Sequence, residues 1–100
     1  MNKYSLKDLL NIKKDKPAVR VINKFVSGEE IDEIMLTKSL SSLITHGLIE
    51  IEHSESYEEA QSKHEGYHLE DLALSLYCFM AGNLDMEEIR LRLEGMLNES

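Results

Sequence analysis

The chain has 100 residues, 42% of them hydrophobic and 30% charged, which is typical of one small globular domain and excludes disorder throughout. No apolar run approaches the ~18 residues that a membrane-spanning helix needs, and the N-terminus has no apolar signal region, so we expect a cytoplasmic protein. A single cysteine, Cys78, cannot form an intramolecular disulfide and fits a small apolar side chain.

The net charge of −8 is unevenly distributed along the chain. Residues 1–24 contain seven lysine or arginine residues and two aspartates, a net charge of +5, whereas the other 76 residues carry −13. An acidic body of this kind repels phosphate backbones and favours basic protein partners. Solvation of exposed helix faces is the simpler interpretation of most of these acidic side chains.

Two amphipathic helices are expected at the N-terminal end. Ser5 and Asp8 form a capping box for the first helix, whose apolar residues are Leu6, Leu9 and Leu10. Pro17 opens the second helix, which ends at 27–28 and carries a stripe of Val19, Ile22 and Val26.

Residues 29–46 follow helical spacing, but Thr37 leaves two interpretations open. In the first, one continuous helix has an acidic first turn containing Glu29, Glu30, Asp32 and Glu33. In the second, Thr37 caps a separate short helix carrying Lys38, Ser39, Ser41, Ser42 and Thr45. The two interpretations place these polar side chains in different structural roles.

A strand and a polar loop are expected next. Gly47 supplies a left-handed residue that ends the helix, and the alternation around Ile49 and Ile51 predicts a half-buried strand over 48–53. Residues 54–65 are too hydrophilic to pack and are expected to form a loop or mobile wing. Tyr67 and Leu69 then form the returning strand.

Two further helices complete the chain. The first has apolar residues from Leu69 to Met80 and ends at Gly82, and Asp85 with Glu88 forms a capping box for the second. The last helix carries an apolar stripe of Met86, Ile89, Leu93, Met96 and Leu97. We expect this stripe to form a homodimer interface, the alternative being that it folds back onto the first helix.

The segments Gly-Leu-Ile-Glu at 47–50 and Gly-Tyr-His-Leu-Glu-Asp-Leu at 66–72 make residues 17–81 resemble the winged helix-turn-helix family. The resemblance implies a mainly α fold with a small β-hairpin, in one domain of residues 1–100. A winged-helix-like core over 17–81 would be flanked by a basic N-terminal helix within 1–16 and a C-terminal helix over 85–97. In DNA-binding members the third helix enters the major groove and the wing touches the backbone, which correspond here to 37–46 and 54–65.

The predicted wing departs from this pattern, because it has four glutamates and one lysine and would repel phosphates. We therefore expect a regulatory protein-binding module without enzymatic activity. It would bind a basic surface of a partner protein through Glu29, Glu30, Asp32, Glu33, Glu55, Glu58 and Glu59. The alternative is a homodimeric DNA-binding transcriptional regulator that reads DNA with Lys38, Ser39, Ser41, Ser42 and Thr45.

Residues 64–68 match the His-Glu-x-x-His string of zinc peptidases, in which two histidines share one helix face, and Glu87 or Glu88 would be the third ligand. Gly66 interrupts the string at an expected loop-to-strand junction, which gives poor chelate geometry. We therefore predict no metal, no cofactor and no catalytic residue, and a zinc-dependent peptidase is the third hypothesis. A loose site of His53, His64 and His68 is a further alternative, and surface histidines are the simplest interpretation.

Overall fold

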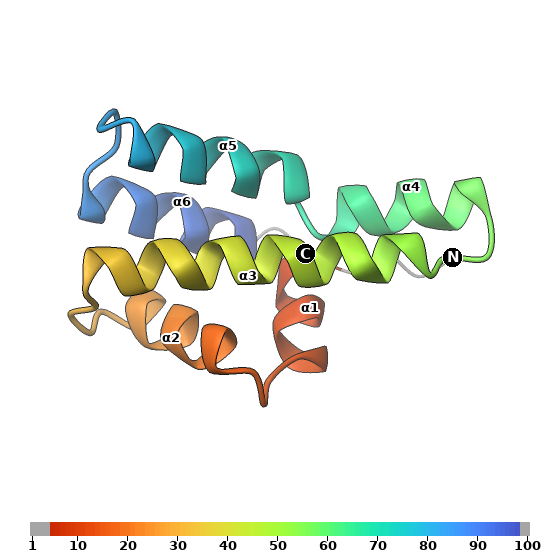
Figure 1. Cartoon of the computed structure of the whole chain (residues 1–100), viewed down its shortest axis with the longest axis horizontal. Helices are drawn as coiled ribbons and strands as arrows, with labels where there is room; N and C mark the ends of the chain where they lie inside the picture. Colours follow the sequence, from red (N-terminus) through yellow and green to blue (C-terminus); the bar gives the residue numbers. More distant parts are fainter. Residues whose placement is uncertain (1–4, 99–100) are drawn as a thin grey trace.

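The computed structural model describes residues 5–98, which form six α-helices and no strand (Figure 1). Short turns connect the helices, and the two longest helices are α3 and α6. In chain order the helices are α1 (Leu6–Ile12), α2 (Pro17–Val26), α3 (Glu33–Glu52), α4 (Tyr57–Gly66), α5 (Leu69–Met80) and α6 (Met86–Asn98).

The 20-residue helix α3 is the central element, about 30 Å long at 1.5 Å per residue. In Figure 1, α2 lies on one side of it, α5 on the other, and α4 lies beside its C-terminal half. The α6 helix packs against α1, α2 and α5. One continuous apolar core joins all these helices except α4, and its fully buried side chains include Leu6, Leu9, Val19, Phe25, Leu36, Leu40, Leu43, Leu72, Ile89 and Leu93.

Several predicted helix boundaries are confirmed by hydrogen bonds. Ser5 Oγ accepts from the Asp8 amide at 3.2 Å and Asp8 Oδ2 accepts from the Ser5 amide at 3.1 Å, which completes the first capping box. The box before α6 joins Asp85 and Glu88 in the same way, at 2.8 and 3.1 Å. Pro17 occupies the first turn of α2 as expected.

The predicted hairpin is wrong, and with it the winged-helix resemblance. The expected strand 48–53 continues α3 to Glu52, the expected wing 54–65 contains most of α4, and the expected returning strand lies at the turn between α4 and α5. The apolar and polar alternation around Ile49 and Ile51 spans only one helical turn, too short to distinguish the two periods. The buried positions of α3 keep helical spacing from Leu36 through Gly47.

The polar segment after α3 forms a helix because its charges suit one. Ser56 caps α4 by accepting a hydrogen bond from the Glu59 amide at 3.1 Å. Glu58 and Glu59 lie in the first turn and Lys63 and His64 in the last, where they complement the helix dipole. Hydrophilicity alone therefore gave the wrong prediction of a loop.

Gly47 does not end a helix. It lies buried in the middle of α3, and the described glycines with positive φ are Gly28 and Gly82. A Cβ added at Gly47 would lie 2.6 Å from Leu69 Cδ2 of α5. The absent side chain therefore makes room for the close approach of α5 to α3, and the prediction of a left-handed residue is wrong.

Gly47→Val should destabilise the fold by about 1–3 kcal/mol, because the added carbons overpack the contact with Leu69. Urea unfolding followed by circular dichroism measures this change. In a Leu69→Ala background the same substitution should cost less, since the clashing methyl groups are gone. An equal cost in both backgrounds would show that the contact with Leu69 is not the reason for glycine.

The predicted dimer stripe of α6 is packed inside the chain. Ile89, Leu93 and Met96 are buried in the core, and Met86 and Leu97 are partly buried against it. The alternative of folding back is what the structure shows, because α6 contacts α1, whose Leu6 and Leu9 are fully buried. The stripe therefore has partners within its own chain, so the unpartnered surface that suggested a dimer interface there does not exist, and a dimer stays a prediction.

Arg90 connects α6 to the end of α2. Its Nε donates to the Phe25 carbonyl oxygen at 2.9 Å, and its guanidinium lies 4.6 Å from the centroid of the Phe25 ring. The Glu87 carboxylate accepts from the same guanidinium at 2.6 Å. The last carbonyl groups of a helix have no partner inside the helix, and the Phe25 carbonyl accepts from Arg90 and from the Gly28 amide, the latter at 3.1 Å.

Arg90→Ala should lower the free energy of unfolding by about 1–3 kcal/mol, because the Phe25 carbonyl loses a charged donor and the ring loses its cation. Arg90→Lys should recover only part of the loss, since a lysine lacks the Nε donor. Arg20→Ala is the matched control on an exposed surface and should change stability by less than about 0.5 kcal/mol. Equal effects of Arg90→Ala and Arg20→Ala in thermal unfolding would contradict the role of Arg90.

Candidate functional site

An apolar groove lies between α2 and the N-terminal half of α3, with a volume of about 490 Å³. Ile34 and Met35 of α3 both line this groove, and their side chains are 66% and 50% exposed. The residues that line the groove are Pro17, Ala18, Val21, Asp32, Ile34, Met35, Lys38 and Ser39. A hollow of this size with an apolar lining and few polar groups has the character of a binding site.

Local structure fixes the two walls of the groove. Asp32 caps α3, and its Oδ2 accepts hydrogen bonds from the amides of Ile34 at 3.1 Å and Met35 at 3.2 Å. These bonds hold the first turn of α3 and therefore the two exposed apolar residues on it. On the opposite wall, Pro17 starts α2 with a fixed φ angle. Both walls are thus rigid at their helix N-termini.

The charges around the groove differ between its two ends. Glu29, Glu30 and Glu33 are exposed at the end where the chain turns from α2 into α3. Lys38 lies one turn further along α3, and Lys16 precedes Pro17 at the far end of the antiparallel α2. The end near the α2–α3 turn is therefore mainly acidic, with Lys24 as an exposed basic residue in the last turn of α2, and the other end has Lys38 and Lys16 with Asp15 beside them.

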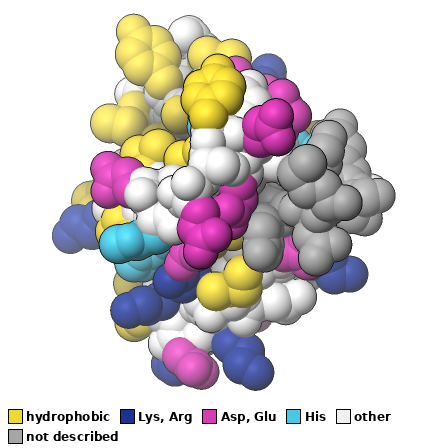
Figure 2. Space-filling model, turned by 90° about the vertical axis from the view of Figure 1, so that its right-hand side faces the viewer, with side chains coloured by type: hydrophobic (Ala, Val, Ile, Leu, Met, Phe, Trp, Pro, Cys, Tyr) yellow, Lys and Arg dark blue, Asp and Glu magenta, His cyan; other side chains and the backbone are white. Residues whose placement is uncertain are grey.

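The two predicted acidic groups lie at opposite ends of α3. Glu29, Glu30, Asp32 and Glu33 are at its start, whereas Glu55, Glu58 and Glu59 follow its end, about 30 Å away. Figure 2 shows the second end, where acidic side chains gather in the middle of the face and basic side chains lie along its lower edge. The sequence hypothesis joined these residues into one acidic face, and the structure separates them.

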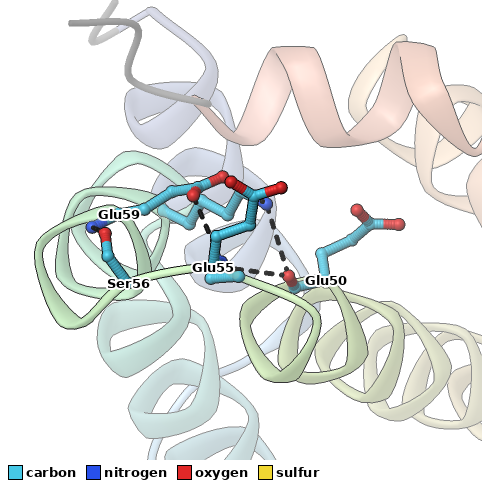
Figure 3. Close-up of polar contacts among 6 residues, drawn as sticks. Glu50, Glu55, Ser56 and Glu59 are labelled. Atoms are coloured by element: carbon cyan, nitrogen blue, oxygen red, sulfur yellow. Dashed lines mark hydrogen bonds and ion pairs between the residues drawn. The ribbon is translucent and has the colours of Figure 1, made fainter.

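The second acidic group takes part in holding α3 to α4. Glu59 Oε2 accepts from the Glu55 amide at 3.2 Å, beside the cap from Ser56 (Figure 3). The buried Lys63 lies 3.4 Å from Glu59 Oε1 and donates to the Glu50 carbonyl oxygen at 3.5 Å. These contacts give Glu59 a structural role at the α3–α4 turn, while Glu55 and Glu58 remain exposed.

Glu50 also anchors the chain that follows α1. Lys13 Nζ lies 2.7 Å from Glu50 Oε1. The hydrogen bond from Lys13 lowers the pKa of the Glu50 carboxyl below its ordinary value of 4.5. The pKa of Glu50 is lower in the folded protein than in the unfolded chain. The Lys13–Glu50 pair therefore stabilises the fold fully above pH 4.5, and this stabilisation is lost as the pH falls through the pKa of Glu50 in the folded protein.

Lys13→Met should lower the free energy of unfolding at pH 7 by about 0.5–1 kcal/mol, because the ion pair is partly shielded from solvent. The difference between wild type and variant should shrink as the pH falls below 4.5, where Glu50 becomes protonated in the unfolded chain and then in the folded one. Urea unfolding at pH 7 and at acid pH measures both quantities. A difference that stays constant with pH would contradict the coupling.

The candidate DNA-reading residues do not form a separate recognition helix. Thr37 does not cap a helix; its hydroxyl donates to the Glu33 carbonyl oxygen at 2.9 Å inside the continuous α3. Ser39 is buried, and the other four candidates, Lys38, Ser41, Ser42 and Thr45, are at least partly exposed.

Partial burial, with Lys16 and Lys13 nearby, lowers the pKa of His46 below 6.5, so this ring adds little positive charge at pH 7. Helices α2, α4 and α5 pack against α3, and residues 37–46 are an internal part of it. The DNA-binding alternative thus lacks the recognition helix and wing on which it depended, and it stays untested.

The histidine string spans the junction between α4 and α5. His64 lies in the last turn of α4, while His68 precedes α5 with a left-handed φ of 56°, so the two do not share a helix face. Both line a hollow of about 220 Å³, and His64 Nδ1 lies 3.8 Å from Glu70 Oε1. Within residues 5–98 no group of three histidine, cysteine, aspartate or glutamate residues could hold a metal ion.

The third-ligand candidates of that string are occupied elsewhere. Glu87 pairs with Arg90, and Glu88 closes the capping box with Asp85. His53 caps the C-terminus of α3. The expected loop-to-strand junction is a helix-to-helix junction, which also breaks the helical spacing that a zinc peptidase needs.

The sequence hypotheses missed the apolar walls of the groove, although the sequence contains a signal for them. Ile34, Met35 and Leu36 are three consecutive apolar residues in one helix. Only one face of a surface helix points at the core, and Leu36 lies on that face. Ile34 and Met35 must therefore point away from the core. Pro17 was predicted only as the start of the second helix.

Comparisons of this chain with protein-family models, with curated proteins and with solved structures each found no match. Across the described part of the chain, no helix has the length and apolar character needed to cross a membrane. The functional argument therefore depends on the geometry of the groove and its charges.

Proposed function

We propose that this protein is a regulatory protein-binding module whose groove between α2 and α3 receives an amphipathic helix of a partner protein. The observation that carries the proposal is the apolar groove itself, with Ile34 and Met35 more exposed than large apolar side chains usually are. A partner helix with apolar residues spaced three and four apart would cover these side chains. The proposal assigns no catalytic step to the chain.

The two charged ends of the groove specify the orientation of the partner helix. Basic side chains at its C-terminal end would meet Glu29, Glu30 and Glu33, and acidic side chains at its N-terminal end would meet Lys38 and Lys16. Helices often carry acidic residues in the first turn and basic residues in the last, because both complement the helix dipole. The same charges on the partner therefore stabilise its helix and its binding.

This proposal keeps part of the original hypothesis of a basic partner surface. The acidic residues at the start of α3 lie beside an apolar wall, so they can combine charge with burial of apolar area. In the acidic group after α3, Glu59 is already held by Lys63. Charge at exposed positions contributes mainly to the rate and specificity of association, whereas the buried apolar contacts supply most of the affinity.

Two synthetic helical peptides of identical composition test the proposal. Both carry leucines at helical spacing; the matched peptide has glutamates in its N-terminal turns and lysines in its C-terminal turns, and the other has these charges exchanged. Fluorescence anisotropy should give the matched peptide at least about tenfold higher affinity, a difference of ~1.4 kcal/mol. Backbone amide shifts in nuclear magnetic resonance should change around Val21, Ile34 and Lys38.

Variants of the protein separate groove binding from adhesion to any apolar surface. Ile34→Glu should abolish binding, and Lys38→Glu should reduce or reverse the preference for the matched peptide. Tyr77→Glu removes an exposed aromatic side chain of α5 and should have no effect. Equal affinities for the two peptides, or a loss of binding in Tyr77→Glu equal to that in Ile34→Glu, would contradict the proposal.

A further inference from the structure

Helix α5 carries large apolar side chains on its outer face as well as on the face that packs in the core. Leu69, Leu72, Leu76 and Phe79 point into the core, whereas Leu74, Tyr77 and Met80 are 57%, 68% and 65% exposed. The exposed Glu70 and Asp71 lie at the start of this outer face, so its apolar part runs from Leu74 to Met80. Exposed apolar side chains that gather on one face mark a candidate interaction surface, and the neighbouring helix α6 has one more large apolar side chain, Leu91, that is 57% exposed.

A hollow of about 200 Å³ lies beside this face, between α5 and α6. Asp71 and Leu74 line its α5 wall, and Arg92 and Gly95 line its α6 wall. The position that a Cβ would take at Gly95 has no atom within 4 Å, so the α6 wall is open there. The hollow thus combines space for an apolar side chain with one acidic and one basic residue on opposite walls.

We propose that the α5–α6 face binds a second copy of this chain in a two-fold symmetric dimer. In a two-fold symmetric dimer the same patch of both copies meets at the interface. Such a patch is complementary to itself when it contains both an acidic and a basic side chain. Here Asp71 of one copy would meet Arg92 of the other, twice per interface. Leu74 of each copy would enter the hollow beside Gly95 of the other, and Tyr77 and Leu91 would be covered at the edges.

The dimer leaves the α2–α3 groove accessible, since α5 and α2 lie on opposite sides of α3 in Figure 1. A dimer would then present two grooves and bind a partner with two helices more tightly than a single groove can. Self-association uses residues outside the groove, so it holds or fails independently of the proposed function.

Charge reversal at the two polar positions is the decisive test. Sedimentation equilibrium should show the wild type as a dimer at ~100 µM, a concentration well above a Kd of ~10 µM. Asp71→Arg places two arginines together at each contact, and Arg92→Asp places two aspartates together. Each variant alone should therefore weaken dimerisation by about tenfold or more.

Mixing the two variants should restore the dimer. In a mixed pair, the arginine introduced at position 71 faces the aspartate introduced at position 92, and the native Arg92 faces the native Asp71, so both contacts are attractive. A binding site for an unrelated protein would give no such rescue. Circular dichroism on each variant confirms that the helices remain folded.

Two further variants, one in α5 and one in the α2–α3 groove, complete the test. Tyr77→Glu should weaken the dimer through the loss of apolar contact, and Lys38→Glu, a charge reversal in the α2–α3 groove, should leave it unchanged. A wild type that stays monomeric at ~1 mM, single reversals that leave the dimer intact, or a mixture of the two variants that stays monomeric would each overturn the proposal.

Discussion

The close contact between Gly47 and Leu69 allows α3 and α5 to approach each other in the middle of the fold. A side chain at Gly47 would collide with Leu69, so the absence of one lets α5 lie against α3 without interrupting it. Glycine in a helix interior costs about 0.5–1 kcal/mol relative to alanine, and here close packing compensates for that cost. An uninterrupted α3 then provides one long surface on which α2, α4 and α5 pack.

The length of α3 decides how the polar groups are distributed. The acidic residues before its start and after its end are kept about 30 Å apart, so they cannot act on one small partner surface. The Asp32 cap at its start also fixes Ile34 and Met35 at the edge of the groove. A structural hydrogen bond and the candidate binding surface therefore depend on the same turn of helix.

Polar side chains add contacts between elements at the ends of helices. Lys63 joins α4 to the end of α3, Arg90 joins α6 to the end of α2, and Lys13 ties the chain after α1 to Glu50. Two of these contacts bring a charged donor to a carbonyl group near a helix C-terminus; the Phe25 carbonyl also accepts from the Gly28 amide, and the Glu50 carbonyl also accepts from the Ser54 hydroxyl. The helix α4 depends most on such contacts, because its buried residues are Lys63 and Gly66.

The sequence by itself determined the helices whose ends carry local signals. Ser5 with Asp8, Pro17, and Asp85 with Glu88 act on neighbouring residues, so their effects could be read without knowledge of the fold. The apolar stripes of α1, α2 and α6 were visible for the same reason. Even the groove has a local signal, the run of three apolar residues from Ile34 to Leu36.

Only the tertiary structure decided what Gly47, the segment 54–65 and the α6 stripe do. A glycine that ends a helix and a glycine that permits close packing look alike in sequence, because the difference lies in Leu69, 22 positions away. The cap of the polar α4 is local, since Ser56 accepts from the Glu59 amide, but Lys63 finds its carbonyl partner at the end of α3. The stripe of α6 has its partners in α1 and α2 at the other end of the chain, and such long-range contacts leave no trace in local periodicity.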